Sequence, residues 1–377
     1  MTEEPKLAFI QALRGFAALA VAVSHLRFAL HDQNPWLQSL LQLGSAGVDL
    51  FFVISGFIMV YTTRNNDGSG QYASDFLAKR FLRIWVPYAF VGLFFFCLLT
   101  PNPFSNENLV WIAKSLLFIP PDAAQTFYLG SGLLLVAWSL NYEFFFYLLF
   151  GGSLLFGRFR WLALAAAFVL LTVVVPMLYH GSFTFSVNTR LTSGPALLQM
   201  MTNPMLLEFA AGVLIGLIYF SSIRIGNSAL CWVFLSTLLA AGAIIWLSAF
   251  RPENGLLGWG LPAVIAVFAL AISSKTLPLS PPRFLVFLGT ISYSLYLVHL
   301  PIELKLLGPY LAPKMSFFIF APVALAASIA AAALAYVVFE RLVHDQLRRA
   351  LMARLSGSRR GPTAQPGYRA LHQANAA

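Results

Sequence analysis

An arginine and a histidine interrupt the first long apolar segment, in the stretch RGFAALAVAVSH from Arg14 to His25. Ionisable groups inside a bilayer are costly, so they usually face a protein interior or a wet cavity and have a function. The two residues are eleven positions apart, which places both side chains on nearly the same helix face, about 16 Å apart. Arginine binds phosphates bidentately, and histidine can take a proton from a hydroxyl. The pair therefore predicts an anion site and a general base on one helix.

Other apolar segments supply candidate partners for His25. We expect Asp49, Glu143, Glu208 and His299 to converge with it in the outer half of the membrane. Of these, Asp49 or Glu143 could orient the imidazole, because a carboxylate can fix the tautomer of a histidine. The histidine would then act as general base on a hydroxyl group.

A basic cluster, KRFLR, supplies Lys79, Arg80 and Arg83 at the predicted inner face. With Arg14, these residues form a candidate site for an anionic cytoplasmic reactant. The polarity pattern favours a reaction between that anion and a neutral, hydroxyl-bearing molecule outside. The sequence shows no spacing typical of a metal site.

Composition identifies an integral membrane protein. Of the 377 residues, 59% are hydrophobic and 10% are charged, and the mean hydropathy is +0.76. A soluble domain would carry about 25% charged residues. The two cysteines, Cys97 and Cys231, lie in different apolar blocks and form no disulfide framework. The net charge of +10 reflects basic residues on inner segments and does not indicate a nucleic-acid partner.

The predicted fold is all-α, a polytopic membrane helix bundle with about ten transmembrane helices and both termini cytoplasmic. Most Lys and Arg residues fall on segments that this orientation keeps in the cytoplasm. Residues 1–344 form the membrane domain, and residues 345–377 form a basic, disordered tail near anionic lipid headgroups. The expected spans are 9–30, 44–63, 84–101, 131–150, 160–180, 204–221, 229–250, 257–273, 284–304 and 315–340.

An ordered set of motifs resembles the acyltransferase 3 family of integral membrane O-acyltransferases, most closely its exopolysaccharide O-acetyltransferase branch. The matching pieces extend from residue 10 to about residue 302 in the family's order. They are IQALRGFAALAVAVSH, GVDLFFVISGFIMVYTT, FLAKRFLRIWVPY, AWSLNYEFFFYLLF, LLEFAAGVLIG and LGTISYSLYLVHLPI. Each string is unspecific by itself, but the ordered set is specific.

The resemblance implies an activity and a set of site residues. His25 would be catalytic, as general base or acyl carrier, and Arg14 would be essential to the same site. The donor would be an acyl-CoA, with acetyl-CoA favoured, and no metal would be needed. The acceptor would be a hydroxyl of an extracytoplasmic or lipid-linked glycan such as exopolysaccharide, at the bacterial cytoplasmic (inner) membrane. Membership of a polysaccharide synthesis or export complex stays open.

Further positions carry over from the family's motifs. Arg80 and Arg83 match its basic pair, and Glu143 belongs to its tryptophan-serine-glutamate stretch. The remaining matches, which we interpret as substrate-binding, are Trp138, Ser139, Tyr293, Ser294 and His299.

Two departures from the family's pattern qualify the match. Gln11 and Ala12 stand where many relatives carry an acidic residue before the arginine. Glu340 is followed by Arg341 and Leu342, without the proline that many relatives have there, which leaves the role of Glu340 open.

Two other functions use the same residues. A proton-coupled transporter of a polar solute could employ the histidines and carboxylates as a relay. The sequence shows no internal repeat, which argues against this class because many transporters are built from repeats. The third hypothesis is that the chain is a non-catalytic membrane subunit of a polysaccharide synthesis machine. The hydroxyls of Tyr293, Ser294 and Tyr296 also suit simple helix packing.

Overall fold

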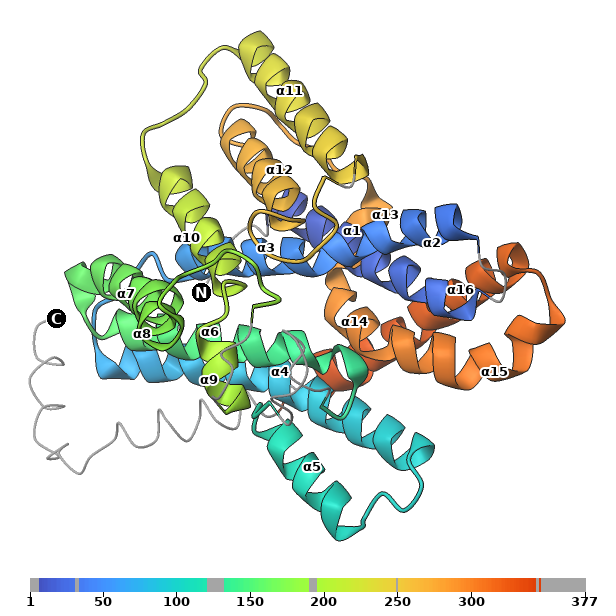
Figure 1. Cartoon of the computed structure of the whole chain (residues 1–377). Coiled ribbons are helices and arrows are strands. Elements are labelled where there is room, and N and C mark those ends of the chain that lie inside the picture. Colours follow the sequence, from blue (N-terminus) through green and yellow to red (C-terminus); the bar gives the residue numbers. More distant parts are fainter. Residues whose placement is uncertain are drawn as a thin grey trace, which may run out of the picture.

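The computed structural model describes residues 7–30, 34–120, 132–189, 195–248, 250–343 and 346. These residues form helices and connecting segments, with no strand among them, as an all-α fold requires (Figure 1). The predicted tail, 345–377, lies outside the described residues except for position 346. The α-helices are α1 (Ala8–His25), α2 (Pro35–Gln42), α3 (Gly47–Thr62), α4 (Gly70–Leu99), α5 (Asn106–Leu116), α6 (Trp138–Leu154), α7 (Arg160–Val169), α8 (Val175–His180), α9 (Ala196–Met201), α10 (Leu206–Phe220), α11 (Ser228–Leu247), α12 (Gly260–Ser273), α13 (Arg283–Thr290), α14 (Ser292–Leu300), α15 (Gly308–Leu311) and α16 (Phe317–Ala335).

Short 3₁₀ or π-helical turns extend several of these helices. The two used below are η6 (Pro301–Leu307), which continues α14, and η8 (Tyr336–Val343), which continues α16. The others are η1 (Leu26–Ala29), η2 (Leu43–Ala46), η3 (Leu135–Ala137), η4 (Gly157–Phe159), η5 (Leu170–Val174) and η7 (Ala312–Lys314).

The described residues contain seven helical stretches long and apolar enough to cross a membrane, or eight if a bent pair counts as one span. The bent pair joins α13 to the segment from Ser292 to Lys314 at 71°. The predicted count of ten is therefore not confirmed. Helix α6 has 17 residues and α12 has 14, fewer than the about 20 that a straight span needs. The chain is a multi-pass membrane protein.

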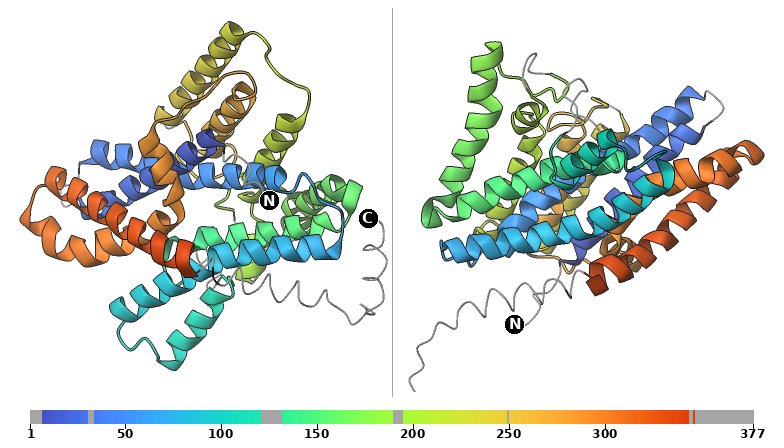
Figure 2. Two further views of the ribbon diagram at one scale, coloured as in Figure 1. Left: turned by 180° about the vertical axis from the view of Figure 1, so that it is seen from behind. Right: turned by 90° about the horizontal axis from the view of Figure 1, so that it is seen from below.

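The centre of the molecule is built from helices distant in sequence. Helix α1 packs against α3, α13 and α14, α4 packs against α6, and α14 packs against α16. Figure 1 shows α4 and α6 running alongside each other, with α11 and α12 projecting on the opposite side of α3. The two further views in Figure 2 show the same arrangement, with α16 beside the α14–α15 segment. This packing brings one face each of α1, α3, α4, α6 and α14 to a common interior.

Glycines permit the closest of these helix contacts. A Cβ at Gly15 of α1 would lie 2.1 Å from the Leu285 carbonyl oxygen of α13. A Cβ at Gly56 of α3 would lie 2.1 Å from the Phe209 carbonyl oxygen of α10. Both separations are too short for any side chain, so glycine at these two positions allows the helices to approach closely. Backbone contact of this kind is a common way to associate membrane helices.

Candidate functional site

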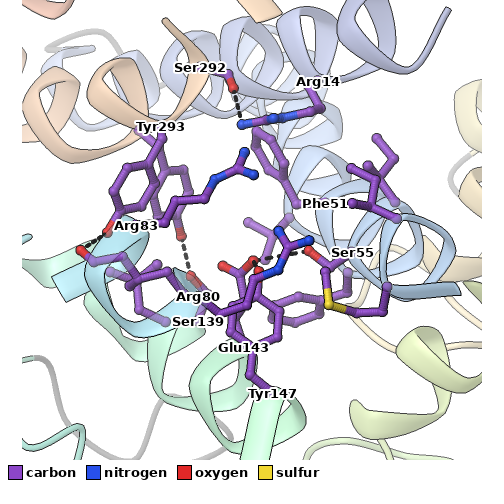
Figure 3. A pocket seen from close by; sticks show the side chains of 18 residues that line it. Arg14, Phe51, Ser55, Arg80, Arg83, Ser139, Glu143, Tyr147, Ser292 and Tyr293 are labelled. Carbon is purple, nitrogen blue, oxygen red and sulfur yellow. Dashed lines mark hydrogen bonds between the residues drawn. The ribbon is translucent and has the colours of Figure 1, made fainter. Parts of the chain in front are cut away.

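A cavity lies where α1, α3, α4, α6 and α14 meet (Figure 3). It brings together three arginines and one glutamate that are separate in sequence. The polar side chains that line it are Arg14, Ser55, Arg80, Arg83, Ser139, Glu143, Tyr147, Ser292, Tyr293 and Tyr296. Apolar residues of α3, among them Phe51, Phe52 and Met59, complete the wall.

Arg14 enters the cavity from α1. Its Nη2 donates a hydrogen bond to the Ser292 hydroxyl at 3.0 Å, and this hydroxyl donates in turn to the Gly289 carbonyl at 2.9 Å. Ser292 is the first residue of α14, just after the bend that separates α13 from α14. The bend therefore supplies the acceptor that holds Arg14 toward the cavity.

Arg80 and Arg83 enter from α4. This helix begins after Ser69, whose side chain caps it by accepting the Tyr72 N–H at 3.0 Å. Arg80 donates to the Thr62 hydroxyl at 3.0 Å and lies 5.8 Å from the centre of the Tyr147 ring. Arg83 interacts electrostatically with Arg14 across the cavity. Two guanidinium groups that the fold holds close to each other favour the binding of an anion between them.

Lys79, the other expected member of the basic cluster, lies differently. Its side chain is exposed, and it is not among the described residues that line the cavity. The structure thus brings Arg14, Arg80 and Arg83 together and leaves Lys79 outside.

Glu143 of α6 is the acidic group of the cavity. It accepts hydrogen bonds from the Ser55 hydroxyl at 3.0 Å and from the Tyr147 hydroxyl one helical turn away. It also interacts electrostatically with Arg14 and Arg80. One carboxylate facing three guanidinium groups leaves the cavity with an excess of positive charge.

Two of the residues expected to bind substrate line the cavity. The Ser139 and Tyr296 hydroxyls lie 2.7 Å apart, and the Tyr293 hydroxyl donates to the Ile84 carbonyl at 2.7 Å. Among the described residues, Trp138 and Ser294 lie outside the lining. The indole of Trp138 packs edge-on against Phe52.

Ser294 instead connects α14 to Glu340 of η8. Its N–H and its hydroxyl both donate to Glu340 Oε1, at 3.1 and 2.5 Å. Glu340 also interacts electrostatically with Arg14 and Arg83. Glu340, whose role the sequence left open, is thus a second carboxylate that interacts with the arginines, and the three guanidinium groups still outnumber the two carboxylates.

His25 and His299 form a second polar cluster. His25 ends α1, and His299 lies near the end of α14. The Nε2 of His299 is 3.2 Å from the Nδ1 of His25, and the ring centres are 5.1 Å apart. His299 is fully buried, whereas His25 is partly exposed. The expected convergence of the two histidines is present.

Asp49 and Glu208 belong to a third polar cluster. Asp49 accepts hydrogen bonds from Asn254 Nδ2 at 2.7 Å and from the Gly255 N–H at 2.8 Å. The carboxyl group of Glu208 interacts with that of Asp49, and both side chains are fully buried. From the sequence, either Asp49 or Glu143 could orient His25. Their hydrogen bonds among the described residues go elsewhere, and the partner of His25 is His299.

Sequence reasoning missed three polar residues of the cavity, namely Ser55, Tyr147 and Ser292. Tyr147 carried a signal, because it lies four residues after Glu143 and therefore on the same helix face. Ser292 directly precedes the Tyr293–Ser294 pair that the motif includes. Ser55 carried no signal beyond being a polar residue in an apolar span.

The fold and the site define a class: a multi-pass membrane protein with an arginine-lined cavity at Arg14 of α1 and a histidine pair at His25, the last residue of the same helix. The family model described as an acyltransferase domain matches residues 7–338, and the chain belongs to this acyltransferase 3 family.

Two named relatives extend the comparison. The exopolysaccharide production protein ExoZ of Rhizobium meliloti (strain 1021) is 29% identical over 266 residues, covering 68% of this chain and 76% of that protein. The acyltransferase MdmB of Streptomyces mycarofaciens is 26% identical over 316 residues, covering 78% of each protein. No solved structure matches the chain significantly. The chain is therefore a membrane O-acyltransferase.

Proposed function

We propose that this chain transfers an acetyl group from cytoplasmic acetyl-CoA to a hydroxyl of an extracytoplasmic or lipid-linked glycan, such as exopolysaccharide. In this proposal both termini are cytoplasmic, and the protein lies in the bacterial cytoplasmic membrane. The single observation that carries it is the distribution of chemistry along α1, with Arg14 in an arginine-lined cavity and His25 three turns further on. The name of the relative ExoZ supports a glycan acceptor.

The cavity suits the anionic end of the donor. Coenzyme A carries phosphate groups, and arginine forks bind phosphate oxygens with paired, charge-assisted hydrogen bonds. Arg14, Arg80 and Arg83 are the candidate donors of these bonds. The Cα atoms of Arg14 and His25 are separated by about 16 Å of helix. An extended pantetheine arm is of comparable length, so phosphates held in the cavity allow the thioester to reach His25.

The chemical step then needs one base. The Nε2 of His25 takes the proton of the sugar hydroxyl as its oxygen attacks the thioester carbonyl. The carbon–sulfur bond breaks, and the thiolate of CoA leaves and receives a proton from the imidazolium. General base catalysis of this kind contributes typically about 10²- to 10⁴-fold. A covalent route, in which His25 first carries the acyl group, uses the same nitrogen.

The test compares membranes that hold the wild-type chain with membranes that hold His25→Ala at matched expression. Radiolabel from acetyl-CoA is followed into cell-envelope polysaccharide. We expect the rate of label incorporation to be lower in the variant by a factor of at least about 10². Lys79→Gln is the matched control, because Lys79 lies outside the cavity lining and should retain full activity. Equal label with wild type and His25→Ala would overturn the proposal.

The covalent route is tested separately. Membranes are incubated with labelled acetyl-CoA in the absence of acceptor and quenched rapidly. Label trapped on His25 would establish an acyl-enzyme, whereas direct transfer predicts none.

A further inference from the structure

The two histidines of the pair share a hydrogen-bonding pattern. His25 Nδ1 lies 2.9 Å from the Val21 carbonyl oxygen, and His299 Nδ1 lies 2.9 Å from the Leu295 carbonyl oxygen. Each ring thus reaches back to the carbonyl four residues earlier in its own helix. The rings then meet through His299 Nε2 and His25 Nδ1, at 3.2 Å.

These contacts determine where the protons are. A carbonyl oxygen only accepts hydrogen bonds, so the Nδ1 of His299 must carry a proton. In a neutral imidazole the other nitrogen is then an acceptor, so the Nε2 of His299 presents a lone pair to His25. The Nδ1 of His25 faces two acceptors and must be the donor. The Nε2 of neutral His25 is therefore the unprotonated, basic nitrogen.

The Val21 carbonyl does not hold His25 by itself. It also accepts a hydrogen bond from the Ser24 hydroxyl at 2.7 Å. A carbonyl oxygen has only two lone pairs, so the Ser24 hydroxyl and the Nδ1–H of His25 share them. His299 offers its Nε2 to His25 from a fully buried position on a neighbouring helix. Among the described residues, no protein group hydrogen-bonds the Nε2 of His25, whose side chain is partly exposed. That nitrogen is therefore available to a substrate.

We propose that His299 is the positioning residue of the catalytic histidine: its Nε2 accepts a hydrogen bond from the Nδ1–H of His25, keeps the Nε2 of His25 as the base, and stabilises the imidazolium formed during transfer. The proposal rests on the function proposed above. It assigns to a neutral imidazole the role that a carboxylate has in other histidine-based sites. A neutral partner avoids the cost of a buried, ionised carboxylate next to His25 in the resting enzyme.

A spectroscopic test does not depend on activity. The protein is purified in lipid nanodiscs with ¹⁵N-labelled histidine rings, and the two signals are assigned with His25→Gln and His299→Gln. We expect both rings to carry the proton on Nδ1, and a scalar coupling across the hydrogen bond between His25 Nδ1 and His299 Nε2. A proton found on His25 Nε2, or no coupling between the rings, would overturn the assignment. These outcomes hold even if the protein uses another acyl donor.

A kinetic test asks whether the pair serves transfer. His299→Leu removes the acceptor, and we expect the maximal rate to fall about 10- to 100-fold, the loss typical when the partner that orients a metal-binding histidine is removed. The KM for acetyl-CoA should not change, because the arginine cavity is intact. In His299→Gln, the side-chain oxygen can accept a hydrogen bond from the Nδ1–H of His25, so this variant should recover most of the lost rate. Equal loss in both variants, with both folded, would contradict the proposal.

The double variant His25→Ala/His299→Leu separates positioning from an independent role. Residues that act as one unit are strongly non-additive. The double variant should therefore be no slower than His25→Ala alone. A further loss comparable to that of His299→Leu would show that His299 acts apart from His25. Folding of each variant is checked by size-exclusion chromatography and thermal unfolding.

Discussion

Arg14 donates a hydrogen bond to the Ser292 hydroxyl at 3.0 Å, although the two residues are 278 positions apart in sequence. The hydroxyl is itself fixed by its bond to the Gly289 carbonyl at 2.9 Å. One Nη nitrogen of Arg14 thus orients the side chain, and no other hydrogen bond from a described residue engages the guanidinium, which can bind a ligand in the cavity with its other N–H groups. A lysine ammonium has its three donors on a single nitrogen and lacks the planar fork that binds a phosphate bidentately.

Arg14→Lys should therefore weaken donor binding although it keeps the charge. Hydrogen bonds to charged groups contribute about 1.5 to 3 kcal/mol, so we expect the apparent KM for acetyl-CoA to rise about 10- to 100-fold. Ser292→Ala should give a smaller rise, because it removes the orienting bond and leaves the guanidinium. The measurement is the initial rate of label incorporation against acetyl-CoA concentration. An unchanged KM in Arg14→Lys would show that Arg14 does not contact the donor.

The arginines of α4 allow a direct comparison within one short segment. Arg80→Gln and Arg83→Gln each remove a cation that lines the cavity, whereas Lys79→Gln removes one that is exposed outside it. We expect each arginine variant to weaken CoA binding about 10- to 100-fold. The lysine variant should bind CoA as the wild type does. Equilibrium binding of labelled CoA to purified protein is the measurement, and equal weakening in all three variants would favour a general surface effect.

The polar faces of the helices could be predicted from sequence, but their partners could not. A charge inside an apolar segment, such as Arg14, is expected to face the protein interior, and the basic cluster with Arg80 and Arg83 is expected beside it at the inner face. The periodicity of a helix fixes the face on which a residue lies, and it does not say which distant helix or loop that face meets. Asp49 is therefore one of two carboxylates that the sequence offers as partners of His25, whereas its hydrogen bonds come from Asn254 and the Gly255 backbone.

The bend between α13 and α14 is a second feature that the sequence did not reveal. Residues 284–304 were expected to form one span, and the chain instead turns by 71° after Thr290. The first proline of this segment is Pro301, well beyond the bend. The bend lies next to a close contact of α13 with α1, where a Cβ at Gly289 would lie 1.9 Å from the Gln11 carbonyl oxygen. Long-range packing of this kind has no local signature.

Substitution of Gly56 should reduce stability, because this residue lies at a close contact between α3 and α10. Gly56→Ala puts a methyl group 2.1 Å from the Phe209 carbonyl oxygen, so α3 and α10 must separate. Overpacking of this kind typically costs about 1 to 3 kcal/mol. Gly152→Ala is the matched control, because a Cβ there meets no atom of the described residues within 4 Å. Thermal unfolding of the purified proteins should show a lower midpoint for Gly56→Ala alone. Equal midpoints would mean that the helices adapt without cost.

Substitution of Asp49 tests whether this residue stabilises the fold or takes part in catalysis. It is fully buried, and its carboxylate accepts two hydrogen bonds from the connection between α11 and α12. Gly255 has a φ of 111°, a conformation that favours glycine, and its N–H points to Asp49. Asp49→Ala leaves both donors without their partner, at a cost of about 1 to 3 kcal/mol for each group that stays buried.

We therefore expect Asp49→Ala to lower the unfolding midpoint, and Asn254→Ala to lower it less, because only one of the two bonds is lost. Transfer per folded molecule and the KM for acetyl-CoA should stay close to wild type in both variants. The comparison requires thermal unfolding and label incorporation on the same preparations. If Asp49→Ala kept its unfolding midpoint and lost transfer, Asp49 would act on the chemistry after all. Its contacts with Asn254 and Gly255 would then be secondary to a role at His25.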